Sequence, residues 1–363
     1  MKKLFLRILT IGLLTFAASL VLHYHVYPLF KLTTWSWGSP IIHQKRLYLD
    51  RHPDDFNMVV IGSSRVYRQI DPSILDTEIV ADTSVKAFNF GVNWLFAPES
   101  FYIFDHLKKD HPNLKYAIIE LSKIKSIDYP NLHTTRIKYW YNFDRITFAL
   151  KAISTSVFSF PEKLATSVAH LISYFDKLIN LGYVTEAVDF NSNHMYSDKY
   201  DELGPDLNGF KPYADVDPSK IVTEPGEDQM WNVRFHNDTS VVTKRKEISA
   251  MQFAKFESNP ELLQKYNTKY VHHLKEMISQ AKSQGIHLIF LISPRVDKNQ
   301  YNEIIPVFNQ LPPSNRIEIS DSRDYPELYL ARYSTDETHL NKSGSVIYTK
   351  ILARKINDIL QAR

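Results

Sequence analysis

The stretch NMVVIGSSR, residues 57–65, decides the fold. Its apolar centre is rich in β-branched residues and ends at Gly62, a pattern that predicts a short buried strand. Ser63 and Ser64 then fall on the turn after the strand, where the Ser64 hydroxyl would stand at the carboxyl edge of a sheet. Backbone N–H groups in that turn can stabilise a developing oxyanion. Taken alone, Gly-Ser-Ser is also ordinary turn chemistry.

Outward from this stretch, strands and helices alternate along the chain. Further short apolar runs predict strands at residues 86–90, 116–121, 286–292 and 316–320. Apolar residues at helical spacing predict helices at residues 97–109, 261–283 and 343–360. The alternation indicates an α/β domain with a mostly parallel sheet covered on both faces. Ligands of such sheets bind beyond the carboxyl ends of the strands.

Residues 131–243 interrupt this alternation. The segment starts with aromatic helical sequence and becomes polar and turn-rich from residue 191 to residue 238. We interpret it as an insertion or lid over the strand ends. The expected organisation is a membrane anchor at 1–30, a juxtamembrane linker at 31–54 and the α/β domain at 55–363.

The N-terminus predicts a membrane helix. Basic residues precede an apolar run that reaches Leu22, near the shorter end of the length that spans a bilayer. The basic start indicates a cytoplasmic N-terminus, with the remainder exported. A cleaved signal peptide is the main alternative, and a buried soluble helix is another. An uncleaved anchor is favoured because the apolar run continues past the small residues where cleavage would fall.

Composition excludes several classes of protein. The 363 residues carry a formal net charge of +3, which gives no global case for nucleic acid binding. There is no Cys, which rules out a disulfide scaffold, a Cys-ligated metal site and a thiol nucleophile. Only 10 residues are Gly, which argues against a Gly-rich phosphate-binding fold.

A second candidate for chemistry precedes the last predicted helix. Asp336 and His339 are three residues apart, so one helical turn would put them on the same side. In a catalytic triad the carboxylate orients the imidazole, which takes the proton of the nucleophile. The alternative is that Asp336 is a helix N-terminal acid and His339 a solvated surface residue.

Together, the Gly-x-Ser turn after a strand and the late Asp-x-x-His resemble the SGNH (GDSL-type) hydrolase superfamily. The resemblance covers roughly residues 55–125 and 265–360. It implies a three-layer, flavodoxin-like α/β/α domain in which Ser64 is the nucleophile and Asp336 and His339 complete the triad. The run FNFGVN (residues 88–93) is similar to the second block of the family, so Gly91 and Ser64 would line the oxyanion hole with their N–H groups. No metal or organic cofactor is implied.

The sequence departs from the family pattern at the third block. This block usually places an Asn after a strand, but the matching residues 119–122 read IELS. Ser122, or a residue of the insertion, would have to replace that donor. Asn89, Asn93 and Arg65 are further candidates for substrate binding, and Arg65 and Arg68 offer charge-assisted contacts to an anionic polymer or donor as an alternative to a solvated surface.

With its N-terminal anchor, its Gly-Ser-Ser turn and no Asn in the third block, the sequence resembles an envelope branch of the superfamily. This branch includes proteins similar to the D-alanyl-lipoteichoic acid synthesis and alginate O-acetylation proteins. The resemblance implies a membrane-anchored, extracytoplasmic serine acyltransferase or esterase for acyl groups, O-acetyl above all, of a cell-surface polysaccharide. Its partners would be the glycan, an acyl donor and a multi-spanning membrane O-acyltransferase. The missing Asn motivates the alternative, a catalytically silent binding subunit of an envelope polysaccharide complex.

Overall fold

The computed structural model of the chain describes residues 2–22, 25, 39–123, 132, 134, 136–179, 200–213, 239–263 and 267–362. Five parallel strands form one sheet in the order β2-β1-β3-β4-β5. The strands are β1 (Met58–Gly62), β2 (Ala87–Gly91), β3 (Tyr116–Glu120), β4 (His287–Ile292) and β5 (Arg316–Glu318). All five lie within two residues of the predicted runs, so the predicted parallel α/β sheet is confirmed.

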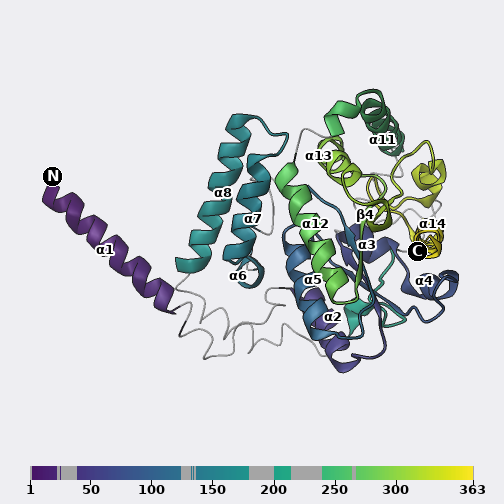
Figure 1. The fold of residues 1–363 in the computed structure, drawn as a ribbon, viewed down its shortest axis with the longest axis horizontal. Coiled ribbons are helices and arrows are strands. Elements are labelled where there is room, and N and C mark those ends of the chain that lie inside the picture. The colour runs from purple at the N-terminus through teal and green to yellow at the C-terminus, as the bar shows by residue number, and fades with distance from the viewer. Residues whose placement is uncertain are drawn as a thin grey trace, which may run out of the picture.

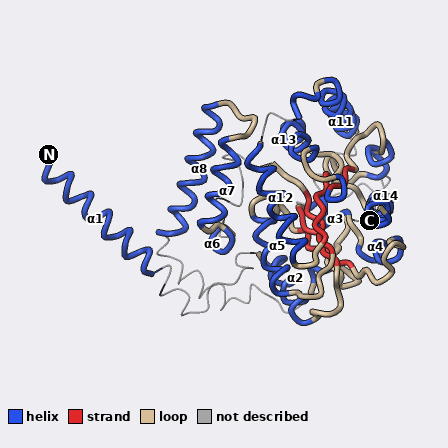
Figure 2. The backbone as a smooth tube through the Cα atoms, in the orientation of Figure 1, coloured by secondary structure: helices blue, strands red, loops and turns tan. Residues whose placement is uncertain are grey.

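The sheet has a core on each face. Successive residues of a strand point to opposite sides, and β1 follows this rule: Val59 and Ile61 enter one apolar cluster, while Met58 and Val60 enter the other. Because both faces are buried, the strands are continuous apolar runs and do not alternate with polar residues. Figure 2 shows the strands in red with helices on either side.

The helices divide between the two faces. The helices of the first cluster are α2 (Pro40–Arg51), α5 (Glu99–Asp110), α6 (Ile137–Trp140), α7 (Phe143–Ser154), α12 (Thr268–Ser283) and α13 (Lys298–Asn309), with Phe256 of α11 (Ser240–Ser258) at its margin. Those of the second cluster are α3 (Ser64–Gln69), α4 (Pro72–Glu78) and α14 (Lys342–Gln361). Figure 1 shows α5 and α12 side by side, away from α4 and α14. Helix α14 agrees with its predicted range, whereas α12 begins at Thr268, later than the predicted residue 261.

The predicted juxtamembrane linker contains a helix that belongs to the domain. Ser39 caps α2 by accepting a hydrogen bond from the Ile42 N–H, and Pro40 occupies the first turn, where a missing N–H costs nothing. Lys45 is fully buried, and its ammonium donates to the carbonyl oxygens of Asn89, Gly91 and Gly209 at 2.7–2.9 Å. Residues 39–51 are therefore part of the folded unit and not a spacer.

Besides the first residues of α11, the described part of the interruption at 131–243 has two main pieces. Helices α6, α7 and α8 (Phe160–Ile179) form one part, and α7 packs against both α8 and α12. Residues 200–213, which include a 3₁₀ turn at Asp201–Leu203, form the other. This second part follows the edge strand β2, where the Asn208 carbonyl accepts from the Asn89 N–H. Most of the polar stretch at 191–238 lies outside the described residues.

Helix α1 (Lys2–Val21) is long and apolar enough to cross a membrane. It extends away from the rest of the chain in Figure 1, and its apolar side chains are mostly exposed. It touches α8 where the rings of Phe16 and Phe175 meet, with centroids 6.0 Å apart.

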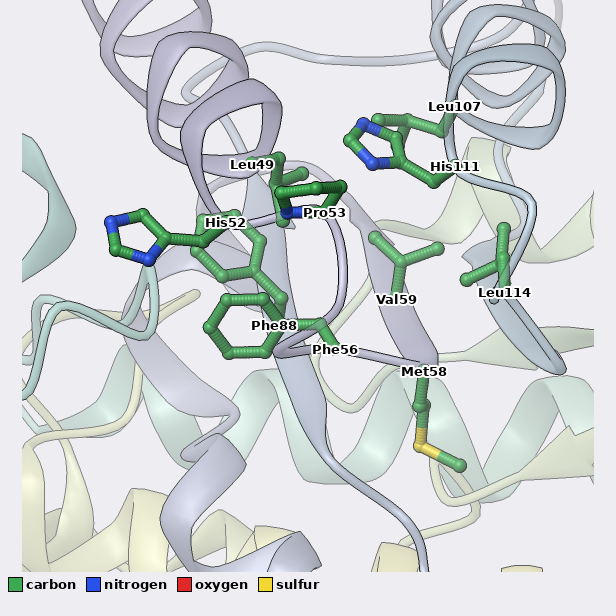
Figure 3. A pocket seen from close by; sticks show the side chains of 10 residues that line it. All are labelled: Leu49, His52, Pro53, Phe56, Met58, Val59, Phe88, Leu107, His111 and Leu114. Carbon is green, nitrogen blue, oxygen red and sulfur yellow. The ribbon is translucent and has the colours of Figure 1, made fainter.

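A small apolar pocket lies at the amino ends of the strands, under Leu49, Phe56, Met58 and Leu114 (Figure 3). Its volume of about 20 Å³ holds roughly one water molecule. It lies at the opposite end of β1 from Ser64.

Candidate active site

The turn after β1 presents Ser64 at the carboxyl edge of the sheet. Ser63 caps α3 through its Oγ, which accepts from the Arg65 N–H, and Ser64 is the first helical residue. Its N–H therefore has no acceptor within the helix. Ser64 is half-buried, whereas Ser63 is buried. Gly62 leaves room for its neighbours, because a Cβ there would stand 2.4 Å from Val66 Cγ2 and 2.6 Å from Cβ of Glu120.

The structure brings Ser64 and His339 together, although they are 275 residues apart. The Ser64 Oγ lies 2.8 Å from His339 Nε2, and His339 Nδ1 lies 2.8 Å from Asp336 Oδ2. The other carboxylate oxygen of Asp336 accepts from the backbone N–H groups of Thr338 and His339 and from the Thr338 hydroxyl. The carboxylate is thus fixed on both sides, and it orients the ring.

The geometry of this pair differs from the expected helical turn. Residues 334–340 form a loop closed by an antiparallel bridge between Ser334 and Leu340, and α14 starts only at Lys342. Asp336 and His339 meet because the carboxylate accepts the N–H of the third residue along, as side-chain oxygens do in tight turns.

The protonation of Asp336 follows from these contacts. Burial alone would raise the pKa of its carboxyl, but the hydrogen bond and charge of His339, with the donors of Thr338, lower that pKa to about 2. Asp336 is therefore ionised at neutral pH, as an acceptor for His339 Nδ1–H must be.

Arg65, expected to bind substrate, is buried and pairs with a carboxylate of the neighbouring strand. Its Nε donates to Glu120 Oε1 at 2.8 Å, and both side chains are buried. The other oxygen of Glu120 accepts from the Ser63 N–H at 2.7 Å. Burial would raise the pKa of Glu120, but Arg65 and Ser63 hold it below its usual value. Glu120, the last residue of β3, thus fixes the turn that carries Ser64.

Gly91 and Asn89 also differ from expectation. The Gly91 N–H, expected in the oxyanion hole, donates to Asn89 Oδ1 at 2.8 Å. Asn89 is fully buried and its amide donates to the carbonyls of Val66 and Ile70, so it joins β2 to α3 and does not face a substrate. A Cβ on Gly91 would stand 2.2 Å from the backbone N of Tyr67. Gly91 is required here for the close approach of α3.

Asn93 remains as a polar group at this edge. It lies two residues beyond Gly91, just as Ser64 lies two residues beyond Gly62, and Gly62 and Gly91 are paired in the sheet. Its Oδ1 is buried without a hydrogen-bond partner among the described residues. Its carbonyl accepts from Arg136 at 3.0 Å.

Ser122, a candidate for the missing donor, lies in the core behind the site. It is buried, its Oγ accepts from the Ala97 N–H at 2.8 Å, and its carbonyl accepts from the Tyr270 hydroxyl. Both oxygens therefore accept bonds that join the end of β3 to the neighbouring segments.

The structure adds Arg295, which sequence reasoning missed. It follows β4 and is completely buried. Its guanidinium donates to the carbonyls of Asp336 and His339 at 3.3 and 3.2 Å, and to the Leu328 carbonyl at 2.7 Å. Arg295 therefore holds the loop that carries the imidazole. A cation directly after a predicted strand was the only available signal.

Tyr213 and Arg68 form a wall beside His339. The Tyr213 ring meets the His339 ring edge-on, with centroids 5.4 Å apart. The Arg68 guanidinium lies between the rings of Tyr67 and Tyr213, 4.4 and 4.8 Å from their centroids, and donates to the Lys211 carbonyl. The end of the 200–213 segment, which belongs to the predicted insertion, thus lies beside His339.

Comparison of the chain with protein-family models, curated proteins and solved structures finds no match.

Proposed function

We propose that the protein is a serine acyl-transfer enzyme, an acyltransferase or esterase, with Ser64 as nucleophile, His339 as general base and Asp336 as the residue that orients it. The observation that carries the proposal is the continuous chain of two 2.8 Å contacts from Ser64 Oγ through the imidazole to the Asp336 carboxylate. Such a chain is how a serine hydroxyl is activated.

The first half-reaction acylates Ser64. Its oxygen attacks the ester carbonyl while His339 Nε2 accepts the hydroxyl proton, and the resulting imidazolium is stabilised by Asp336. The tetrahedral intermediate collapses, the ester C–O bond breaks, and the imidazolium returns the proton to the departing alcohol. The acyl group is left on Ser64 as an ester.

The second half-reaction uses the same groups. His339 takes a proton from the acceptor, whose oxygen attacks the acyl-Ser64 carbonyl, and the proton then passes to the Ser64 oxygen as it leaves. Water as acceptor gives hydrolysis, and a sugar hydroxyl gives transfer.

The oxyanion needs donors other than Gly91, whose N–H is already bonded. The Ser64 N–H, at the first position of α3, is one. We assign the second to the Asn93 side-chain N–H group, because Asn93 stands at the equivalent position beyond the adjacent strand.

The strand order and the apolar helix α1 support the proposal of an SGNH-like, membrane-anchored protein. The strand order 2-1-3-4-5 is that of flavodoxin-like sheets, whose ligands bind at the carboxyl edge beside β1. Helix α1 is suited to anchor the chain, with its basic N-terminus in the cytoplasm and the site outside. We propose acyl groups, O-acetyl above all, of a cell-surface polysaccharide as the substrate class, with a multi-spanning O-acyltransferase as partner.

A second candidate function has an observation in its favour. The bonded Gly91 N–H removes one expected oxyanion donor, as a catalytically silent binding subunit would allow. In that case Ser64→Ala leaves the cellular phenotype unchanged.

The nucleophile is tested with the full chain in detergent. We expect a serine-directed sulfonyl fluoride and an activated acetyl ester each to add one group, located on Ser64 by mass spectrometry. Ser64→Ala should abolish the adduct and His339→Gln should slow its formation by roughly 10³-fold or more. Ser63→Ala is the matched control: it loses a helix cap but keeps the nucleophile, so it should still react. A folded wild-type chain that forms no adduct supports the binding subunit instead.

The acceptor is tested with glycan and acyl donor together. Acylated glycan in excess of free acetate identifies a transferase, whereas free acetate alone identifies an esterase.

A further inference from the structure

Helix α8 buries a row of polar side chains and exposes a row of apolar side chains. Thr166, His170, Ser173 and Lys177 are buried at successive helical spacings. The opposite side carries the α8 stripe, a row of apolar side chains that are between 37% and 77% exposed: Phe160, Leu164, Val168, Leu171, Ile172 and Phe175. This polarity is the reverse of that of a surface helix in a water-soluble domain.

Two residues of the inward polar face bond to the rest of the protein. The His170 ring contacts the Tyr141 hydroxyl, and the Lys177 ammonium donates to the Tyr141 carbonyl at 2.9 Å. Both contacts reach the segment between α6 and α7, so α8 is held in this orientation by specific hydrogen bonds. A rotation that buried the stripe would break both of them.

The stripe is continuous with the helix that is suited to span the membrane. Phe175, its last member, packs on Phe16 of α1. Figure 1 shows α1 and α8 converging at these ends. Between Leu164 and Phe175 there is no Asp, Glu, Lys or Arg, whereas charged residues stand near both ends of the helix. An exposed apolar row of this length is unfavourable in water.

We propose that α8 is a membrane-surface helix whose stripe inserts into the lipid bilayer beside α1. An interfacial helix buries its apolar face among the acyl chains, and its affinity grows with the apolar area buried. Insertion of α8 adds a second attachment to the one made by α1 and fixes the orientation of the domain relative to the bilayer. This inference does not depend on the proposed chemistry at Ser64.

The test uses the absence of Cys in the chain, which makes any introduced Cys the only thiol. Full-length Leu164→Cys, Val168→Cys and Ile172→Cys variants are spin-labelled and reconstituted in phosphatidylethanolamine–phosphatidylglycerol nanodiscs. Collisions with oxygen, which concentrates in lipid, are compared with collisions with a water-soluble nickel chelate. Met251→Cys, at an exposed apolar position on α11, is the matched aqueous control, and Leu9→Cys on α1 is the lipid control.

We expect the three α8 labels to give an oxygen-to-nickel ratio several-fold above that of Met251→Cys and to approach that of Leu9→Cys. A ratio equal to the Met251→Cys value would overturn the proposal, since the stripe would then face water. Poor access of both reagents would also overturn it, because another part of the chain or a protein partner would then cover the stripe.

Discussion

Glu120 Oε1 accepts a hydrogen bond from Arg65 Nε at 2.8 Å, and the two side chains form a buried ion pair directly beneath the turn that carries Ser64. Because the second oxygen of Glu120 binds the Ser63 N–H, strand β3 and helix α3 hold that turn from two sides.

Removing one charge of this ion pair should destabilise the folded protein. Glu120→Gln leaves the Arg65 guanidinium buried without its counter-charge, which should lower the free energy of unfolding by about 3 kcal/mol. Glu78→Gln is the control, because the side chains of Glu78 and its partner Lys350 are 43% and 51% exposed, and it should cost less than about 1 kcal/mol. Denaturant unfolding compares the two. Similar small losses would mean that the pair does not stabilise the turn.

The pKa of Asp336 predicts a pH dependence of stability. Since this pKa is about 2 in the folded chain and near 3.9 when unfolded, the unfolded state binds the proton more tightly. Asp336 therefore stabilises the fold above pH 5, by about 2–3 kcal/mol, and this contribution is lost as the pH falls through the range from about 5 to about 1.

The measurement is the difference in unfolding free energy between the wild type and Asp336→Asn at a series of pH values. It should be largest near pH 7 and shrink toward pH 3. A difference that stays constant over this range would contradict an ionised, hydrogen-bonded Asp336.

Asn93 should act on the rate of acylation and not on stability. If its amide stabilises the oxyanion, Asn93→Ala lowers kcat for a soluble ester by roughly 10²–10³-fold with little change in KM. The midpoint of thermal unfolding should stay near that of the wild type, which separates this role from a structural one. Unchanged kcat would show that another group donates to the oxyanion.

Lys45 should be essential to folding, because three buried carbonyls depend on its ammonium. Lys45→Met leaves those acceptors unpaired and should cost about 3 kcal/mol or more. Lys86→Met is the control, since Lys86 is 61% exposed, and should change stability by less than about 0.5 kcal/mol.

The same contacts predict where a soluble fragment must begin. A fragment that starts at residue 39 retains α2 and should unfold cooperatively, whereas one that starts at residue 55 lacks Lys45 and should not. Equal cooperativity in calorimetry would mean that α2 is dispensable.

Local pattern was sufficient for part of this protein. The strands, the last helix and the apolar N-terminal helix follow from the period and length of apolar runs, which depend on neighbours in the sequence. Ser64 and the Asp336–His339 pair could also be identified from local sequence. Ser64 directly follows a predicted strand, and the pair directly precedes the last predicted helix.

Only the tertiary structure decided which groups meet. The distance between Ser64 and His339 in the sequence does not predict that their side chains approach to 2.8 Å. They meet because the sheet brings the end of β1 and the loop before α14 to the same edge. The Gly91 N–H is taken by Asn89 because α3 packs closely over β2, and Arg65 is taken by Glu120 because β3 lies beside β1. Side-chain partners are set by contacts between distant segments, so they were fixed only when the sheet was assembled.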